Sequence, residues 1–187
     1  NQDIINKSDW VFLAVTPIVG NKILNKLKFN KNKLVISFIS TINLNQLKKI
    51  TGLKSNIIRA IPLPPIALCK GPVPIYPPNS KVKKFFDKLG STVEINNEKL
   101  SLNFWTTSAM MAPFYEILYS LSNWLIKRGI KKENAQKYIS SLFLALSEDA
   151  FNHNKNLKRL VIESQTPGGL NEQAVKDLRK AGFYKLL

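Results

Sequence analysis

The sequence is poor in the side chains that most often carry catalysis. It has one histidine, His153, and one cysteine, Cys69, among 187 residues. One His and one Cys exclude the common zinc sites, and a Ser-His-Asp triad has no support. Any chemistry would therefore have to come from a cofactor, with the protein supplying placement and electrostatics.

The low cysteine count and the lack of long apolar runs limit the classes of protein to which this chain can belong. A single cysteine excludes a disulfide within this chain, which is typical of a reducing compartment, and we expect a cytoplasmic protein. No continuous apolar run is long enough to span a membrane, so we expect no membrane partner. The chain opens with Asn rather than Met, and we expect its natural start to lie upstream.

Arginine is also scarce, although the net charge is +16. The positive residues are 24 Lys and 4 Arg, spread along the whole chain. Proteins that read bases usually use the fork of Arg for bidentate contacts. We interpret the charge as a solvated surface with weak support for an anionic ligand, and we expect no nucleic-acid partner.

Apolar runs of strand length alternate with helical patterns in the first part of the chain. The runs cover residues 9–15, 34–39 and 57–61, and helical spacing follows the first two. This alternation predicts a doubly wound α/β sheet with parallel strands. Residues 66–76 resemble an edge strand broken at Gly71-Pro72, and a helix and a strand at 92–95 close the domain near residue 96.

Ligands bind such sheets at the carboxyl ends of the strands. Proline follows two of these ends. It could fix the loop backbone beside a flat cofactor, or it could simply terminate the strand, and the sequence does not decide between these two interpretations. The three ends are Val15-Thr16-Pro17, Ile39-Ser40-Thr41 and Ile61-Pro62-Leu63-Pro64.

The second part of the chain is helical in pattern. Helical spacing runs over 98–128, with only Pro113 as a possible kink, and resumes over 131–152 after Gly129. Long apolar helices with little sheet to cover indicate association with a second chain. We therefore predict an all-α bundle that forms a homodimer.

A Pro-Gly-Gly turn precedes the last helical pattern. Thr166-Pro167-Gly168-Gly169 must turn tightly, and helical spacing begins at Leu170 and stops at Gly182. N–H groups at such a helix start can hold a carboxylate or phosphate. A capped helix without any ligand is the alternative.

Together these segments resemble the pyrroline-5-carboxylate reductase family of NAD(P)H-dependent enzymes. The resemblance covers almost the whole chain and implies a partial Rossmann domain over 1–96, then a helical dimerisation and substrate-binding domain over 97–187. Its anchors are Phe12-Leu13-Ala14-Val15-Thr16-Pro17, Arg59-Ala60-Ile61-Pro62-Leu63-Pro64-Pro65, Ala112-Pro113-Phe114-Tyr115, Thr166-Pro167-Gly168-Gly169 and Ala181-Gly182-Phe183.

The resemblance implies hydride transfer from NADPH or NADH to the C=N bond of a small imino acid. The reaction would serve proline biosynthesis if the substrate is pyrroline-5-carboxylate. No catalytic residue and no metal ligand is assigned. The implied cofactor residues are Val15, Thr16, Pro17, Ile39 and Ser40, and the implied substrate residues are Thr166, Gly168, Gly169, Asn171 and Tyr115.

The sequence departs from the family pattern in its implied pocket. Thr16 stands where the family usually has Lys, Leu63 where it has Asn, and Leu170-Asn171 where it has a small residue and Thr. Met110-Met111-Ala112 replaces a Gly-Ser-Gly. The pocket should be reshaped, so reductase chemistry is better supported than proline synthesis.

The Gly-rich turn that holds the cofactor pyrophosphate is also absent from the sequence. Because the strand at 9–15 resembles a later strand of the family's sheet, we expect that turn about 50 residues upstream of residue 1, judging from the size of βαβ units.

Two other functions fit the same sequence. One is a catalytically inactive dimeric binding or regulatory homologue, which the altered pocket favours. The other is a related imine reductase or β-hydroxyacid dehydrogenase, although those dehydrogenases use a Lys on the first long helix and no Lys lies between Leu100 and Ile126.

Overall fold

The chain folds into two compact units, Asn1–Met111 and Ala112–Leu187. The computed structural model describes residues 1–153 and 156–187. The sequence places the domain boundary at 96/97, whereas helix α5 (Glu98–Thr107) belongs to the first unit because it packs against strand β4 (Pro72–Tyr76).

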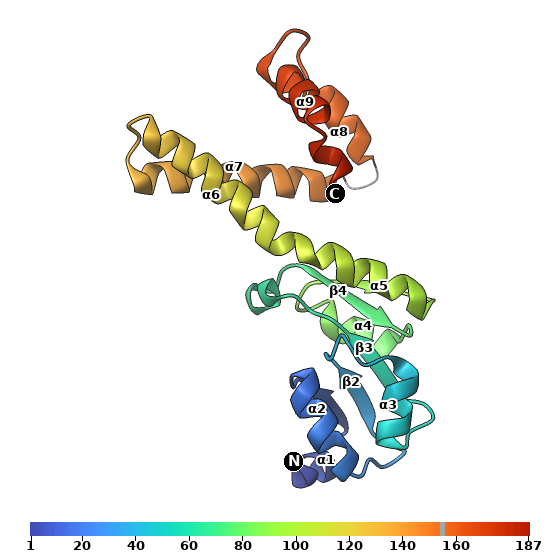
Figure 1. The fold of residues 1–187 in the computed structure, drawn as a ribbon. Helices are drawn as coiled ribbons and strands as arrows, with labels where there is room; N and C mark the ends of the chain where they lie inside the picture. The colour runs from blue at the N-terminus through green and yellow to red at the C-terminus, as the bar shows by residue number, and fades with distance from the viewer. Residues whose placement is uncertain (154–155) are drawn as a thin grey trace. The chain divides into compact units, whose positions relative to one another are not determined.

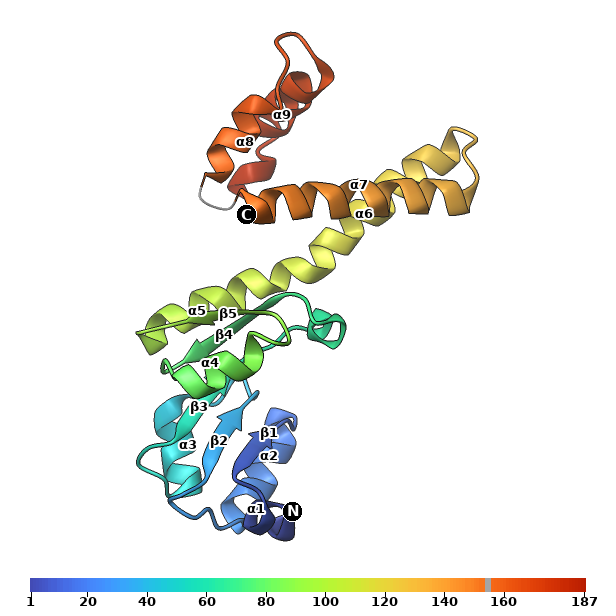
Figure 2. The same cartoon turned by 180° about the vertical axis from the view of Figure 1, so that it is seen from behind.

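The first unit is built on a five-stranded, mainly parallel sheet (Figures 1 and 2). The strands lie in chain order; β1, β2 and β3 are parallel, and β4 runs antiparallel to β3 and parallel to β5. This confirms the α/β class. The other strand bounds are Trp10–Leu13 for β1, Leu34–Ser37 for β2, Ile57–Ala60 for β3 and Ser91–Glu94 for β5.

The prediction of an edge strand over residues 66–76 is wrong. Pro64–Leu68 form a 3₁₀ turn, η2, and only Pro72–Tyr76 form β4, which lies between β3 and β5. Proline within the run indicated an edge, because proline cannot donate to a neighbouring strand. Here the carbonyl of Pro74 accepts the N–H of Ile61 at 3.2 Å, so β3 and β4 meet without a donor from Pro74.

Five helices accompany the sheet in the first unit. Helix α3 starts with a capping box formed by Asn43 and Gln46 and ends at Gly52, whose φ is +71°. Helix α1, before the first strand, was not expected from the sequence. The bounds are Gln2–Lys7 for α1, Pro17–Ile23 for α2, Leu44–Thr51 for α3, Ser80–Phe86 for α4 and Glu98–Thr107 for α5.

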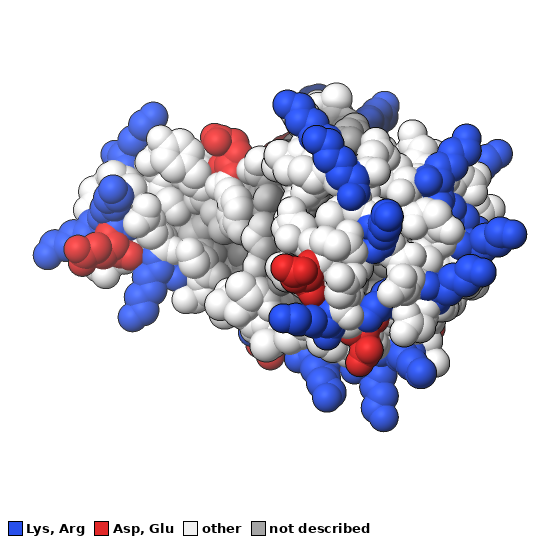
Figure 3. Space-filling model, turned by 90° about the horizontal axis from the view of Figure 1, so that it is seen from below, with Lys and Arg blue, Asp and Glu red and all other residues white. Residues whose placement is uncertain are grey.

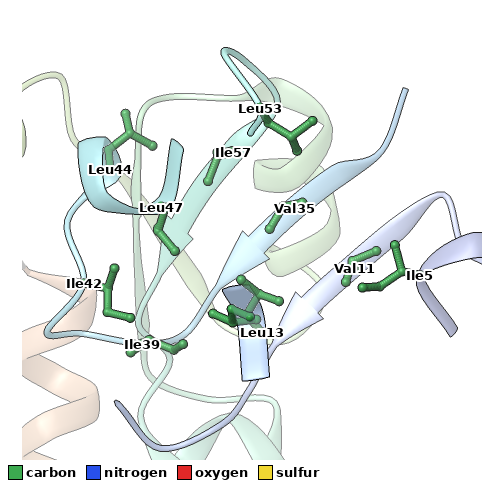
Figure 4. Packing of buried hydrophobic residues seen from close by; sticks show 11 residues of the cluster. Ile5, Val11, Leu13, Val35, Ile39, Ile42, Leu44, Leu47, Leu53 and Ile57 are labelled. Atoms are coloured by element: carbon green, nitrogen blue, oxygen red, sulfur yellow. The ribbon is translucent and has the colours of Figure 1, made fainter. Parts of the chain in front are cut away.

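Both faces of the sheet carry apolar clusters. Along β2, Val35 joins the cluster drawn in Figure 4, while Ile36 joins a second cluster with Val82 and Phe86 of α4. This alternation follows from the two-residue period of a strand and confirms that the apolar runs are buried on both faces. At β1 the second face is only partly covered, since Phe12 remains 39% exposed.

In its described residues the second unit contains four α-helices and few buried side chains. Large apolar side chains remain exposed on it, among them Tyr138 (62%), Leu144 (60%) and Phe151 (62%), while Ala135 and Ile139 are buried. Figure 1 shows α8 and α9 side by side as a helical pair. The bounds are Met111–Lys127 for α6, Lys132–Asn152 for α7, Leu157–Glu163 for α8 and Leu170–Lys180 for α9.

The helix predicted over 98–128 is interrupted, but the interruption lies before Pro113 in the chain. A 3₁₀ turn at Ser108–Met110 separates α5 from α6, and Pro113 lies in the first turn of α6. This is where proline is tolerated, because the first N–H groups of a helix have no partner within the helix.

Positive side chains are dispersed on the molecular face seen in Figure 3, with few acidic ones among them. Such a distribution is typical of a solvated surface. Within the described ranges, no helix has the length and apolar character needed to cross a membrane.

Candidate functional site

The carboxyl ends of β1 and β2 bring the predicted cofactor residues together. Val15 and Pro17 are half-buried, Thr16 and Ser40 are exposed, and Ile39 is 2% exposed. Gly20 of α2 allows this approach, since a Cβ there would lie 3.0 Å from Cδ1 of Ile39 and 3.5 Å from Cγ2 of Val15. Val15 and Pro17 are therefore the partly accessible apolar residues here, Thr16 and Ser40 are exposed, and Ile39 belongs to the core.

Arg59 lies beneath this surface, and sequence reasoning did not assign it to the site. Its Nη2 donates to the carbonyl of Ser40 at 2.7 Å, and its Nη1 donates to Oε1 of Glu98 at 2.9 Å. One feature of the sequence could have indicated its role, namely a charged residue in the middle of an apolar strand, Ile57-Ile58-Arg59-Ala60. Buried charges require partners, so such a residue marks a network.

The Pro-Gly-Gly turn has the backbone geometry that its sequence indicates. Gly168 has a φ of +72°, which favours glycine, and the N–H of Gly169 donates to the carbonyl of Thr166 at 2.8 Å. A Cβ on Gly169 would approach that carbonyl oxygen to 3.0 Å. Helix α9 then begins at Leu170, as predicted.

The chain's own carboxylate occupies one of the N–H groups at this turn. The N–H of Gly168 donates to Oε2 of Glu172 at 2.8 Å, and Oε1 of Glu172 pairs with Nζ of Lys176 at 2.8 Å. The Lys176 ammonium, followed by the Gly168 N–H, holds the pKa of the Glu172 carboxyl below its usual range. Asn171 also bonds locally, donating to the carbonyl of Ser164 at 3.0 Å.

Tyr115 lies on the first part of α6 and is 54% exposed. Its recorded ring contact is with Phe114, at 5.8 Å between centroids. Thr166, Gly168, Gly169 and Asn171 therefore share one turn, whereas Tyr115 belongs to another element of the same unit.

The remaining reactive side chains form no second centre in the described parts of the chain. His153 contacts Asp149, with Nδ1 and Oδ1 at 3.2 Å, and both side chains are largely exposed. Cys69 is exposed in the loop after the 3₁₀ turn η2. No group of three His, Cys, Asp or Glu side chains is arranged to bind a metal among the described residues.

Comparison with known proteins gives one consistent family. A family model described as "Pyrroline-5-carboxylate reductase dimerisation" matches residues 99–187. Over 97% of its length the chain is 23% identical to pyrroline-5-carboxylate reductase of Escherichia coli strain K12, of which it covers 71%. Over 98% it is 26% identical to the enzyme of that name from Synechocystis, again covering 71%.

Solved structures show the same fold. Pyrroline carboxylate reductase of Plasmodium falciparum, a structure with NADP bound, has a TM-score of 0.83 and 22% identity, with 99% of this chain and 74% of that chain covered. The 1-pyrroline-5-carboxylate reductase of Streptococcus pyogenes has a TM-score of 0.80 and 21% identity, with 97% and 72% covered. The family match, the curated relatives and the fold agree: residues 99–187 match the dimerisation domain of the pyrroline-5-carboxylate reductase family, and the chain as a whole is similar to pyrroline-5-carboxylate reductases in sequence and fold.

Proposed function

We propose that this protein is an NAD(P)H-dependent reductase that reduces the C=N bond of a small, carboxylate-bearing cyclic imine. The observation that carries the proposal is the similarity to pyrroline-5-carboxylate reductases over 97% of the chain, through both units. A related protein of the same fold holds NADP, which supports this cofactor class.

The strand ends of the first unit fit the nicotinamide end of such a cofactor. Val15 and Pro17 offer partly accessible apolar surface for a flat ring, the buried side chain of Ile39 supports it, and Thr16 and Ser40 are exposed at the same edge. The bound nicotinamide supplies a hydride from C4. Within the described residues no Gly-rich turn follows a strand, so we assign no residue to the phosphates.

The substrate side of the proposal rests on the turn at Thr166, Gly168, Gly169 and Asn171. Its N–H groups lie at the start of an 11-residue helix, where a carboxylate is favoured by the helix dipole. Glu172 competes for the N–H of Gly168, so a substrate carboxylate would have to displace it. Tyr115 is proposed as a pocket wall, and the proton acceptor and donor groups stay unassigned.

The exposed apolar surface of the second unit supports a homodimer. Its matched family is named for dimerisation, and its long helices leave large apolar side chains at the surface. Burial of that surface against a second copy would remove it from water, which is the main driving force of such association.

A catalytically inactive binding homologue is the second candidate, and one contact favours it. If the Glu172 carboxylate permanently fills the turn, no substrate carboxylate can bind there. The two candidates differ in turnover, not in cofactor binding.

The test is NADPH and NADH oxidation by the full-length gene product with pyrroline-5-carboxylate and other cyclic imino acids. The reductase proposal predicts turnover, and a lower KM for carboxylate substrates after Glu172→Gln. Glu163→Gln is the matched control, because it neutralises an exposed carboxylate paired with Arg159 on α8. If the unaltered protein and the Glu172→Gln variant both bind the cofactor but neither shows turnover, the inactive homologue is favoured.

A further inference from the structure

Arg59 is a fully buried cation in a central strand. Its side chain is 2% exposed on β3, whose other residues, Ile57, Ile58 and Ala60, are apolar and buried. Desolvating a guanidinium is unfavourable unless paired groups compensate for the loss of water. The position of the compensating groups therefore indicates what this charge does.

Arg59 holds the loop that joins β2 to α3 at two points, one directly and one through Glu98. Directly, Nη2 donates to the carbonyl of Ser40 within the loop at 2.7 Å. Indirectly, Nη1 donates at 2.9 Å to Oε1 of Glu98, and the same oxygen accepts the N–H of Leu44, the first residue of α3, at 2.7 Å. One ion pair thus fixes the loop from Ser40 to Leu44.

The network also ties this loop to helix α5. Glu98 is the first residue of α5, and the ring of Trp105 on the same helix lies 5.2 Å from the guanidinium carbon of Arg59. A cation over an indole face is attracted by its quadrupole. Arg suits the position because its planar guanidinium donates to two acceptors that lie in different directions. The single ammonium group of Lys does not have this planar, forked shape.

We propose that Arg59 is a positioning residue that sets the Ser40–Leu44 loop and, through it, the affinity for the nicotinamide cofactor. The second part rests on the proposed function, since Ser40 belongs to the proposed cofactor surface. Arg59 does not touch the cofactor; it acts through the carbonyl of Ser40 and through Glu98.

The experiment compares Arg59→Lys and Arg59→Met with the unaltered full-length protein. NADPH dissociation constants come from fluorescence titration, amide hydrogen exchange reports residues 40–44 without cofactor, and circular dichroism reports folding. We expect Arg59→Lys to fold, to raise the Kd of NADPH about tenfold or more and to leave the KM of the imine nearly unchanged, since small displacements of a binding group have effects of this size. Exchange at Leu44 should be faster in the same variant.

Arg128→Met is the matched control. Arg128 also stacks on an indole, with its guanidinium carbon 4.2 Å from the ring centroid of Trp124, but it is exposed at the end of α6. We expect it to change neither the Kd nor the exchange at Leu44. If Arg59→Met does not fold, the Kd of NADPH and the exchange at Leu44 in Arg59→Lys alone test the proposal.

Three results would overturn the proposal or part of it. Unchanged Kd and unchanged exchange in folded Arg59→Lys would overturn all of it. Faster exchange spread evenly over β1, β2 and β3 would mean that Arg59 only stabilises the sheet. If the unaltered protein binds no NADPH, the proposed function fails and the cofactor clause with it, while exchange at Leu44 still decides whether Arg59 holds the loop.

Discussion

Glu172 and Arg59 illustrate, at the residue scale, how exposure decides what a charge can do. Arg59 is buried, so its bonds hold backbone in place, whereas Glu172 lies at the surface and can exchange its partners for water or a ligand. A surface ion pair contributes little stability but can still occupy a binding group. We therefore treat Arg59 as structural support and Glu172 as a competitor.

The titration of Glu172 tests its contact with the turn. Its pKa is below the usual range because of Lys176 and the Gly168 N–H, so the bond to Gly168 exists above that pKa and is lost as the pH falls through it. In the folded protein we expect the side-chain carboxyl carbon to titrate by NMR at a lower pH than that of an unstructured Glu.

The Lys176→Gln variant supplies the control for this titration. Because Lys176 is the larger cause of the shift, its removal should raise the pKa of Glu172 towards the ordinary value. An unchanged pKa in that variant, or an ordinary pKa in the unaltered protein, would contradict the contact.

The Pro-Gly-Gly turn was predictable at the scale of elements because its residues fix its backbone. Pro167 excludes a continuous helix, Gly168 permits the positive φ, and Leu170 opens the helical spacing. The contact between Gly168 and Glu172 was not predictable, because a partly exposed carboxylate four residues away has many alternative partners. The same limit applies to the 3₁₀ break at Ser108–Met110, where no single residue forbids a helix.

Gly168→Ala should strain this turn and weaken the proposed substrate binding. At a φ of +72° an L side chain is disfavoured, and no atom lies within 4 Å to add a clash, so we expect a loss of about 1 kcal/mol in unfolding free energy. Substrate KM should rise as well. Gly129→Ala, at a φ of +92° in the turn after α6, should lose similar stability without a change in KM.

Helix α7 provides a test of the homodimer. Leu146 is 56% exposed, and Leu146→Glu should weaken self-association on the order of a hundredfold if this face is the centre of an interface. Analytical ultracentrifugation measures the change. Asn32→Glu adds the same charge at an exposed turn of the first unit and should leave the dimer intact. A monomeric unaltered protein would contradict the interface.

At the scale of the whole molecule, alternation of apolar runs and helical patterns was enough to predict the sheet and the helical part. Local residues did not predict that β4 reverses direction, because the antiparallel turn depends on a long connection through η2 rather than on the strand itself. The role of Arg59 was also hidden, since its partners Ser40 and Glu98 are far from it in sequence and meet it only in the fold.

The central claim is the proposal that this protein is a nicotinamide-dependent reductase, and calorimetric titration of the full-length gene product with NADPH and with NADH tests it most directly. We predict saturable binding of at least one of the two with one site per chain, weakened by Arg59→Lys and unaffected by Arg128→Met. Absence of binding of both cofactors by a folded, full-length protein would contradict the claim and leave a protein that keeps the fold without the chemistry.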